Sequence, residues 1–131
     1  MTAAGLEPTV VELADDWSPT AGFRAARVLD PEDFTAAVTA NDEIALGFIS
    51  AMQHAGRHAP VDYSIVGIDD MPSAAFFSPP LTTMRLDFRT LGAQAFQLLQ
   101  QELITGEPAG HFTGEPRLVV RSSTARRETE L

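Results

Sequence analysis

Short apolar runs alternate with helical segments along this chain, and the alternation limits the possible folds more than any other feature. The run YSIVGIDD (63–70) is almost continuously apolar, as is typical of a strand covered on both faces. Other strands are predicted in PTVVELADD (8–16), FTAAVTAND (34–42), LTTMR (81–85) and RLVVRSST (117–124). Parallel strands need crossover connections, so the pattern predicts an α/β fold with a mainly parallel sheet.

Two of the predicted helices lie between these strands. SPTAGFRAARVL (18–29) opens with the Ser-Pro pair expected at an N-cap and the first helical position. In DEIALGFISAMQHAG (42–56), Asn41 or Asp42 is the expected cap and Gly56 the expected end. The apolar residues of this second helix fall on one stripe, which predicts one buried side. The stripe consists of Ile44, Ala45, Phe48, Met52 and Ala55.

The longest predicted helix is DFRTLGAQAFQLLQQELITGE (87–107), which Gly106 is expected to end. Its apolar residues also gather on one side, as in a helix with one buried face. They are Phe88, Leu91, Ala95, Leu98, Leu99 and Leu103.

Composition and charge exclude several classes of protein. A chain of 131 residues with 44% hydrophobic and 21% charged residues is a globular chain with room for one domain. No apolar run approaches the roughly 20 residues of a membrane span, and no signal peptide is expected, so the expected location is the cytoplasm. A net charge of −9 would repel a phosphate backbone, so this chain is not expected to bind nucleic acid directly.

The residues needed for most covalent and metal chemistry are missing. The chain has no cysteine, and all nine of its cations are arginine. A hydrolase would need a histidine beside Asp69 and Asp70, and a phospho-receiver with Asp69 as acceptor would need a lysine. His54 and His58 have a spacing that could bind a metal, but Gly56 is expected to end the helix between them. We therefore expect no enzymatic activity, no catalytic residue, no cofactor and no metal site.

Polar side chains follow three of the predicted strands at the point where each strand ends. They are Asp15, Asp16, Trp17, Asn41, Asp42, Asp69 and Asp70. Ligands of open parallel sheets collect outside the carboxyl ends of the strands. Carboxylates, an amide and an indole suit a polyhydroxylated small molecule, whose hydroxyls donate to acids and whose ring stacks on an aromatic. Each residue also has a structural interpretation: Asn41 and Asp42 as helix caps, Trp17 as a packing residue, Asp69 as the end of a strand.

The chain resembles the C-terminal part of the lactose-repressor (LacI/GalR) family of bacterial transcription regulators. The resemblance rests on an ordered series of segments: DDWSPTAGFRAA, FTAAVTANDEIALGFISAMQHAGRHAP, YSIVGIDD, FFSPPLTTMRLDFRTLGAQAFQLL and RLVVRSSTA. The family joins a helix-turn-helix head to a two-lobed sensor similar to periplasmic sugar-binding proteins. It is usually dimeric, and an effector in the cleft between the lobes changes its affinity for operator DNA.

The resemblance also implies a set of ligand-binding residues. Trp17 matches a cleft aromatic that stacks on the ligand, and Asn41 and Asp69 match polar ligand contacts. Leu86 and Phe88 fall in the stretch that crosses the hinge and lines the cleft. Some sugar-responsive members have an amide where this chain has Leu86, so the resemblance does not carry over the identity of a particular sugar.

The resemblance implies a single partial sensor domain over residues 1–131. Residues 8–87 and 115–124 correspond to the C-terminal lobe, 88–108 to a helix that the family packs on the N-terminal lobe, and 125–131 to a tail. The match begins after that lobe's first strand, which the family places centrally and follows with a ligand-binding arginine. The expected fold is therefore an incomplete three-layer α-β-α lobe of the periplasmic-binding-protein type.

The apolar stripe of the helix at 88–105 would then need a new partner. Six apolar side chains, at roughly 1.5 to 3 kcal/mol for each large one, are too many to leave in water. We expect a homodimer, with exchanged elements as one form of it. The function expected is sensing of a sugar-like effector by part of a transcription regulator. The alternative is a truncated remnant that folds and self-associates but binds nothing.

Overall fold

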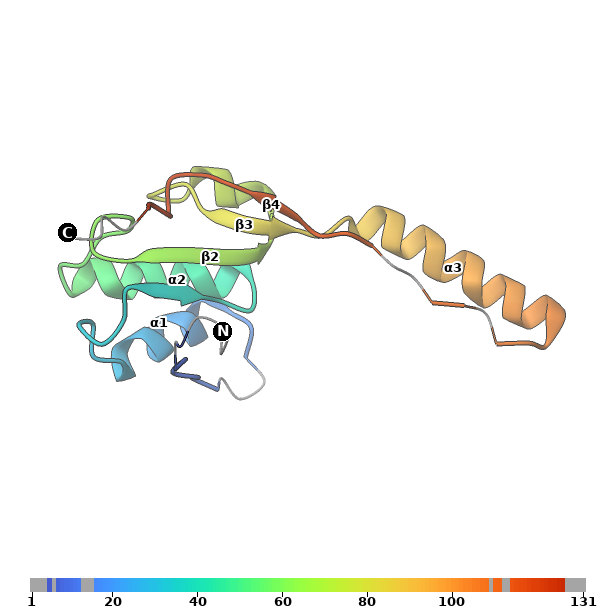
Figure 1. Cartoon of the computed structure of the whole chain (residues 1–131), viewed down its shortest axis with the longest axis horizontal. Coiled ribbons are helices and arrows are strands. Elements are labelled where there is room, and N and C mark those ends of the chain that lie inside the picture. Colours follow the sequence, from blue (N-terminus) through green and yellow to red (C-terminus); the bar gives the residue numbers. More distant parts are fainter. Residues whose placement is uncertain (1–4, 6, 13–15, 109, 112–113, 127–131) are drawn as a thin grey trace.

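The computed structural model describes residues 5, 7–12, 16–108, 110–111 and 114–126. In these residues a four-stranded sheet has the order β1-β2-β3-β4, with β1, β2 and β3 parallel and β4 antiparallel to β3 (Figure 1). The elements in chain order are α1 (Pro19–Val28), β1 (Ala36–Val38), α2 (Asp42–His54), β2 (Ser64–Asp69), the 3₁₀ helix η2 (Pro72–Phe76), β3 (Thr82–Arg85), α3 (Phe88–Thr105) and β4 (Arg117–Val119).

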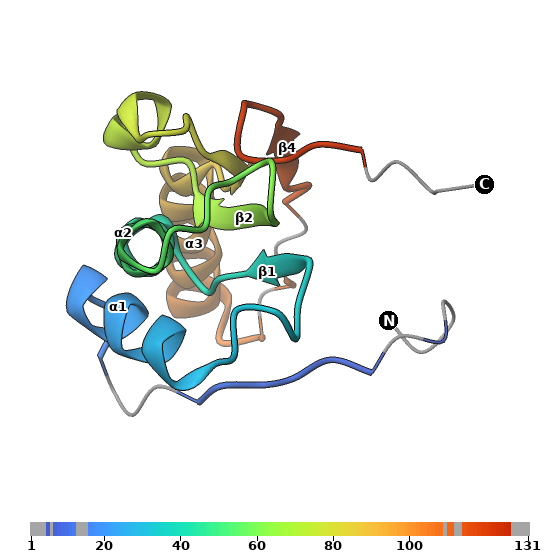
Figure 2. The same cartoon turned by 90° about the vertical axis from the view of Figure 1, so that its left-hand side faces the viewer.

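The predicted α/β class and its mainly parallel sheet are confirmed, and the fold is incomplete as expected. Helices α1 and α2 lie on the same face of the sheet (Figure 2). In the described part of the chain, no helix covers the opposite face. Apolar side chains remain accessible there: Val38 is 66% exposed and Leu118 is 55% exposed. The described elements therefore supply one of the two helical layers of the expected three-layer lobe.

The core lies between α2 and the sheet. The buried side chains of α2 pack with those of β2 and of the loops that flank the strands. The members of this core include Ala45, Phe48, Ile49, Met52, Tyr63, Ile65, Phe77 and Leu81. The predicted stripe is confirmed except at Ala55, which is exposed because α2 ends one residue earlier, at His54. Gly56 follows the cap with φ 77°, the left-handed conformation that glycine adopts most easily.

The strand predicted at 8–16 is wrong in its described part, because residues 8–12 form no strand and 13–15 lie outside the described residues. A strand needs a neighbouring strand to pair with, and residues 8–12 pair with none in the described part of the chain. Thr35 accepts from Ser64 N–H and Thr39 N–H donates to Val66, so the backbone groups of Ala36 and Val38 face away from β2. In the described residues nothing pairs with that outer edge of β1.

The strand predicted at 117–124 is confirmed only for 117–119. Side-chain hydrogen bonds replace the ladder beyond that point. The buried Ser123 hydroxyl accepts from Thr82 N–H and donates to the Ile65 carbonyl, both at 2.7 Å. Because Ser123 also accepts from Ile65 N–H through its carbonyl at 2.9 Å, this segment ties β2 to β3 without being a strand.

Two glycines let α1 and α2 lie in direct backbone contact. A Cβ at Gly47 would lie 1.7 Å from the Pro19 carbonyl oxygen, and one at Gly22 would lie 2.0 Å from the Ile44 carbonyl oxygen. Both distances are far below any real contact, so neither position accepts a side chain unless the helices separate. The predicted caps are confirmed here: Ser18 accepts from Ala21 N–H and Asn41 from Ile44 N–H.

Helix α3 projects away from the rest of the molecule (Figure 1). It begins after Asp87, whose carboxylate accepts from Thr90, and it ends at Gly106 with φ 70°. None of its residues is buried, and Phe88 is 53% and Leu103 78% exposed. The prediction of a long helix with an uncovered apolar stripe is confirmed.

Two buried aspartates fix the segment between β2 and η2. Asp42, first in α2, is 1% exposed and accepts from Thr83 Oγ1 at 2.5 Å and Met71 N–H at 2.8 Å. It is thus an interior hydrogen-bonding group, while Asn41 is the cap.

The second aspartate, Asp70, has a side chain that is 5% exposed and accepts from Arg85 at 2.5 Å and Arg121 at 2.6 Å. Desolvation raises the pKa of Asp70, but the hydrogen bonds from Arg121 and Arg85 outweigh it and hold that pKa below its ordinary value. Arg121 also donates to the Leu81 carbonyl at 2.8 Å, so this ion pair connects the turn after β2 with the ends of β3 and β4.

Replacing Gly47 by alanine tests the contact between α1 and α2. We expect Gly47→Ala to lower the free energy of unfolding by at least about 2 kcal/mol, because the new methyl group forces α1 off α2. Urea denaturation followed by circular dichroism measures it. Gly110→Ala is the control, since a Cβ there meets nothing within 4 Å. Equal stability of both variants and the parent would contradict this packing.

Replacing Asp70 by asparagine tests the ion pairs. We expect Asp70→Asn to lose about 2–3 kcal/mol at pH 7, because two charge-assisted hydrogen bonds disappear. The folded-state pKa of Asp70 is lowered, so its contribution is present above the unfolded pKa of about 3.9 and is lost as pH falls through the lower folded value.

The stability difference between parent and variant should therefore shrink below about pH 4. Asp33→Asn, at an exposed loop position, is the matched control and should change little at any pH. A difference that stays constant from neutral to acid pH would show that Asp70 acts through its shape alone.

Candidate functional site

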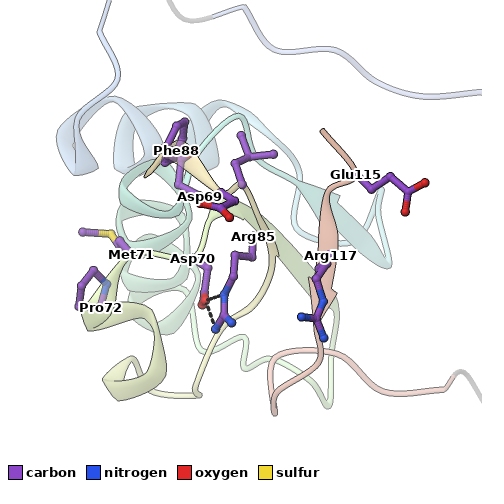
Figure 3. Close-up of a pocket in the computed structure, with 10 residues that line it drawn as sticks. Asp69, Asp70, Met71, Pro72, Arg85, Phe88, Glu115 and Arg117 are labelled. Carbon is purple, nitrogen blue, oxygen red and sulfur yellow. Dashed lines mark hydrogen bonds and ion pairs between the residues drawn. The ribbon is translucent and has the colours of Figure 1, made fainter. Parts of the chain in front are cut away.

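A cavity of about 630 Å³ lies at the carboxyl ends of β2 and β3, where the chain passes into α3 (Figure 3). Three of the five predicted ligand-binding residues line it: Asp69, Leu86 and Phe88. The remaining lining residues are Asp70, Met71, Pro72, Arg85, Asp87, Glu115 and Arg117. Carboxylates, guanidinium groups and an aromatic ring therefore meet in one hollow, as in sites that bind polar small molecules.

The backbone of Asp69 adopts a conformation that is uncommon for residues other than glycine. It has φ 107° and the next residue, Asp70, has φ 54°, so two successive aspartates adopt positive φ at the end of β2. Such conformations cost about 1–3 kcal/mol each and persist only when neighbouring contacts hold them. Two sets of contacts hold this backbone. Asp70 pairs with Arg85 and Arg121, and Asp42 accepts from Met71 N–H.

Asp69 is partly buried, and in the described part of the chain no group of the protein donates a hydrogen bond to its carboxylate. Desolvation, and to a lesser degree repulsion from Asp42, raise the pKa of Asp69 above its ordinary value. A partly desolvated acid without a donor can accept from a ligand hydroxyl without first breaking a contact with the protein. Among the residues that line the cavity, this is the feature that most favours a binding role.

Two arginines on the neighbouring strands also line the cavity, and Asp69 is paired with the first of them, Arg85, in the strand register. Arg85 of β3 and Arg117 of β4 are paired in the strand register and extend in the same direction (Figure 3). Arg85 is held by Asp70, whereas Arg117 is exposed. Asp87 also lines the cavity, but its carboxylate caps α3 by accepting from Thr90, and these hydrogen bonds lower the pKa of Asp87.

The sequence did not single out Arg85, Arg117 or Glu115 as site residues. Their place depends on β4 running antiparallel beside β3, and a sequence pattern does not show which strands pair. One signal was available for Arg85: it comes directly before the stretch Leu86 to Phe88 that was assigned to the cleft.

Trp17 and Asn41, the other two predicted ligand-binding residues, lie together but do not line the cavity. The Asn41 amide donates to the Trp17 carbonyl at 3.1 Å, and its oxygen accepts from Ile44 N–H at 2.7 Å. The capping interpretation of Asn41 is therefore confirmed, and its ligand contact stays a prediction. The Trp17 side chain is 62% exposed, so its ring is available to a partner. The predicted cluster member Asp15 lies outside the described residues.

The histidines lie away from this cavity in the described residues, and none lines it. His54 packs edge-on against Phe23 and contacts the Ser50 carbonyl at 2.7 Å, while His58 follows the end of α2. No group of three His, Cys, Asp or Glu suited to a metal ion occurs among the described side chains. Across the same part of the chain, no helix is both long and apolar enough to cross a membrane.

Comparison with known proteins places this geometry in a family. The sequence family "Periplasmic binding protein-like domain" matches residues 1–124. The transcriptional regulator MalR of Streptomyces coelicolor is 47% identical over 106 residues, which are 79% of this chain and 30% of that protein. The lactose operon repressor of Escherichia coli is 36% identical over 103 residues, 77% of this chain and 28% of the repressor. The chain thus spans about 30% of the length of these curated relatives.

Solved structures of the same family are also similar to this chain. The lac repressor dimer bound to operator and the anti-inducer ONPF superimposes with a TM-score of 0.78 at 34% identity, covering 85% of this chain and 40% of that one. A LacI family regulator from Arthrobacter in complex with lactose has a TM-score of 0.71 at 32% identity, covering 84% and 43%. One from Enterococcus faecalis with bound ribose has 0.76 at 32% identity, covering 84% and 42%. The chain belongs to the periplasmic-binding-protein-like sensor domains of the LacI family of transcription regulators and corresponds to part of such a domain.

Proposed function

We propose that this chain senses a small, polyhydroxylated effector of the sugar type at the cavity beside Asp69 and carries out no chemistry. The observation that carries the proposal is the Asp69 carboxylate, which faces the cavity from a strained turn and lacks a donor in the described part of the chain. Ligand hydroxyls would supply the missing donors. Two similar structures hold lactose and ribose, which supports a neutral polyol as the ligand class.

The remaining cavity residues fit such a ligand. The exposed Arg117, which is paired with Arg85 in the strand register, offers guanidinium donors to hydroxyl oxygens of the ligand. The ring of Phe88 and the side chain of Leu86 offer apolar surface to the C–H face of a sugar ring. The side chain of Leu86 cannot hydrogen-bond, so a ligand hydroxyl placed against it would be left unpaired, and such ligands should bind more weakly.

Trp17 and Asn41 are proposed as the outer part of the same site. The exposed ring of Trp17 is held beside the α2 cap through its carbonyl contact with Asn41. The ring can cover a ligand that extends from the cavity across the strand ends, where β1 and β2 run side by side. The cap already uses the Asn41 amide oxygen, so Asn41 would act by holding Trp17 in place.

The cavity lies at the junction between the sheet and α3, and this position suggests how binding would be transmitted. Its residues come from β2, η2, β3 and β4 and from the start of α3. A ligand that bridges Asp69 and Phe88 would favour one direction of α3 over others, which shifts a population of conformations.

We also propose the division of the domain into residues 8–87 with 115–124, the helix 88–108 and a tail at 125–131.

The assembly proposed is a homodimer in the cytoplasm, without direct contact of this chain to DNA. The exposed apolar face of α3 supports self-association, and a relative is a dimeric repressor.

A second candidate function is that of a truncated remnant, which folds and self-associates but binds nothing. It is favoured by the separation of Trp17 and Asn41 from the cavity, which leaves the predicted site divided.

A thermal-shift screen against mono- and disaccharides, sugar phosphates and nucleosides tests the proposal. A ligand at a hundred times its dissociation constant should stabilise the folded state by about 2.7 kcal/mol. The shift should disappear in Asp69→Asn and persist in Asp33→Asn, which changes the same chemical group at an exposed loop site. A shift that survives in Asp69→Asn would place binding elsewhere, and no shift with any compound would favour the remnant.

A further inference from the structure

Two neighbouring threonines of β3 are buried and make different contacts. Thr82 is 2% exposed and Thr83 is 0% exposed, and successive side chains of a strand point to opposite faces of the sheet. The Thr82 hydroxyl accepts from Arg121 N–H at 2.9 Å and lies 3.0 Å from the Thr124 hydroxyl. It therefore ties β3 to the segment that follows β4. The Thr83 hydroxyl instead reaches α2.

The Thr83 hydroxyl connects Asp42 of α2 with the turn after β2. It donates its single proton to Asp42 Oδ1 at 2.5 Å. Its lone pairs can still accept, and Asp70 N–H donates to it at 3.4 Å. The other oxygen of Asp42, Oδ2, accepts from Met71 N–H at 2.8 Å. Two consecutive backbone amides of the turn are thus held by one threonine and one aspartate.

A glycine provides the space for this pair. Gly67 of β2 is the register partner of Thr83. A Cβ at Gly67 would lie 2.2 Å from Asp42 Oδ1, so any side chain there would push the carboxylate away from the threonine. Glycine inside a strand often marks the close approach of another group, and here that group is the Asp42 carboxylate.

The held amides fix the direction of Asp69. The pairing of Asp69 with Arg85 between β2 and β3 restrains the chain up to the turn. The amides of Asp70 and Met71 restrain the chain directly after it. The positive φ of Asp69, 107°, lies between these two restraints. Without the second restraint the backbone would return to the more common negative φ, and the Asp69 carboxylate would leave its place in the cavity.

We propose that Thr83 is a positioning residue for the effector site, because its hydroxyl, together with Asp42, holds the turn that directs the Asp69 carboxylate into the cavity. The inference rests on the proposed function and goes further by naming a residue that acts on the site without lining it. The ion pairs of Asp70 hold a side chain of the turn, whereas Thr83 and Asp42 hold its backbone.

The competing interpretation is that Thr83 only stabilises the fold. Thr82 provides the matched control, since it has the same side chain on the same strand, is equally buried, and also has two contacts through its hydroxyl. None of these contacts reaches the turn after β2. Thr82→Val and Thr83→Val each remove one buried hydroxyl, so both variants should lose stability in urea denaturation. Only Thr83→Val should change Asp69.

NMR measures the position of Asp69 without any ligand. The coupling between the amide and α protons of Asp69 is small at φ 107° and large in an extended residue. We expect it to be small in the parent and in Thr82→Val, and to increase in Thr83→Val.

Titration of the Asp69 carboxyl carbon is the second NMR readout. Desolvation and the neighbouring Asp42 raise the pKa of Asp69 in the parent. This pKa should fall toward its ordinary value in Thr83→Val, where the carboxylate turns to solvent, and stay raised in Thr82→Val. Both variants keep the other charged residues of the cavity, which are Asp70, Arg85, Asp87, Glu115 and Arg117.

Calorimetric titration with lactose and with ribose, the sugars present in two similar structures, measures the effect on binding. Thr83→Val should raise the Kd for a sugar that the parent binds by at least about tenfold, whereas Thr82→Val should change it by less than about twofold. Thr83→Ser keeps the hydroxyl and should bind like the parent. Thr83→Cys, whose thiol donates weakly, replaces Thr83→Val if that variant does not fold, and should give a smaller change in the same direction.

The NMR and binding experiments separate failure of this inference from failure of the proposed function. A coupling and titration of Asp69 in Thr83→Val that match the parent would overturn the positioning role and show that the ion pairs of Asp70 suffice. An equal loss of sugar binding in Thr82→Val and Thr83→Val would also overturn it, since stability alone would then explain the loss. If neither sugar binds the parent, the test counts against the proposed function, and the NMR data still decide whether Thr83 positions Asp69.

Discussion

The buried carboxylate of Asp42 connects the parts of the chain on which the candidate site depends. It belongs to the first turn of α2, yet it accepts from Thr83 of β3 and from the backbone of Met71 after β2. Gly67 makes room for it, because a Cβ at that position would lie 2.2 Å from the carboxylate. Helix, strand and turn thus meet at one anionic group. Removing one of its partners would leave one oxygen of this carboxyl group in the interior without a hydrogen bond, which costs more than the loss of an ordinary surface contact.

The ion pairs of Asp70 complete this support from the other side. Asp42 and Asp70 hold the turn after β2 in its strained backbone conformation. This turn presents Asp69 to the cavity. Asp69 and Asp70 are neighbours of identical chemistry with opposite pKa shifts. The difference follows from position: arginines donate to Asp70, whereas in the described residues nothing donates to Asp69. Asp70 therefore stabilises the fold, and Asp69 is available to a ligand.

The sequence predicted the elements that carry their own signals. Ser18, Asn41 and Gly106 mark helix ends by local chemistry, and YSIVGIDD marks a buried strand by its unbroken apolar run. The two strands whose bounds were predicted wrongly depend on hydrogen-bonding partners elsewhere in the chain. Residues 8–12 have a strand-like pattern but no strand to pair with, and residues after Val119 bond through the side chain of Ser123 in place of a ladder. The site residues differ in the same way: Asp69 was predicted from its place at a strand end and Leu86 and Phe88 from the family resemblance, whereas Arg117 reaches the cavity only through the pairing of β4 with β3.

Among the described residues no strand pairs with the outer edge of β1, and this matters for the state of the protein at high concentration. The edge is three residues long and carries no charged side chain to discourage the addition of further strands. A contact made by one surface with itself closes after two copies, but a strand edge that binds a different surface leaves its own counterpart free and can continue without limit. Strand addition at the edge of β1 would therefore give an open-ended assembly in place of a discrete one as concentration rises.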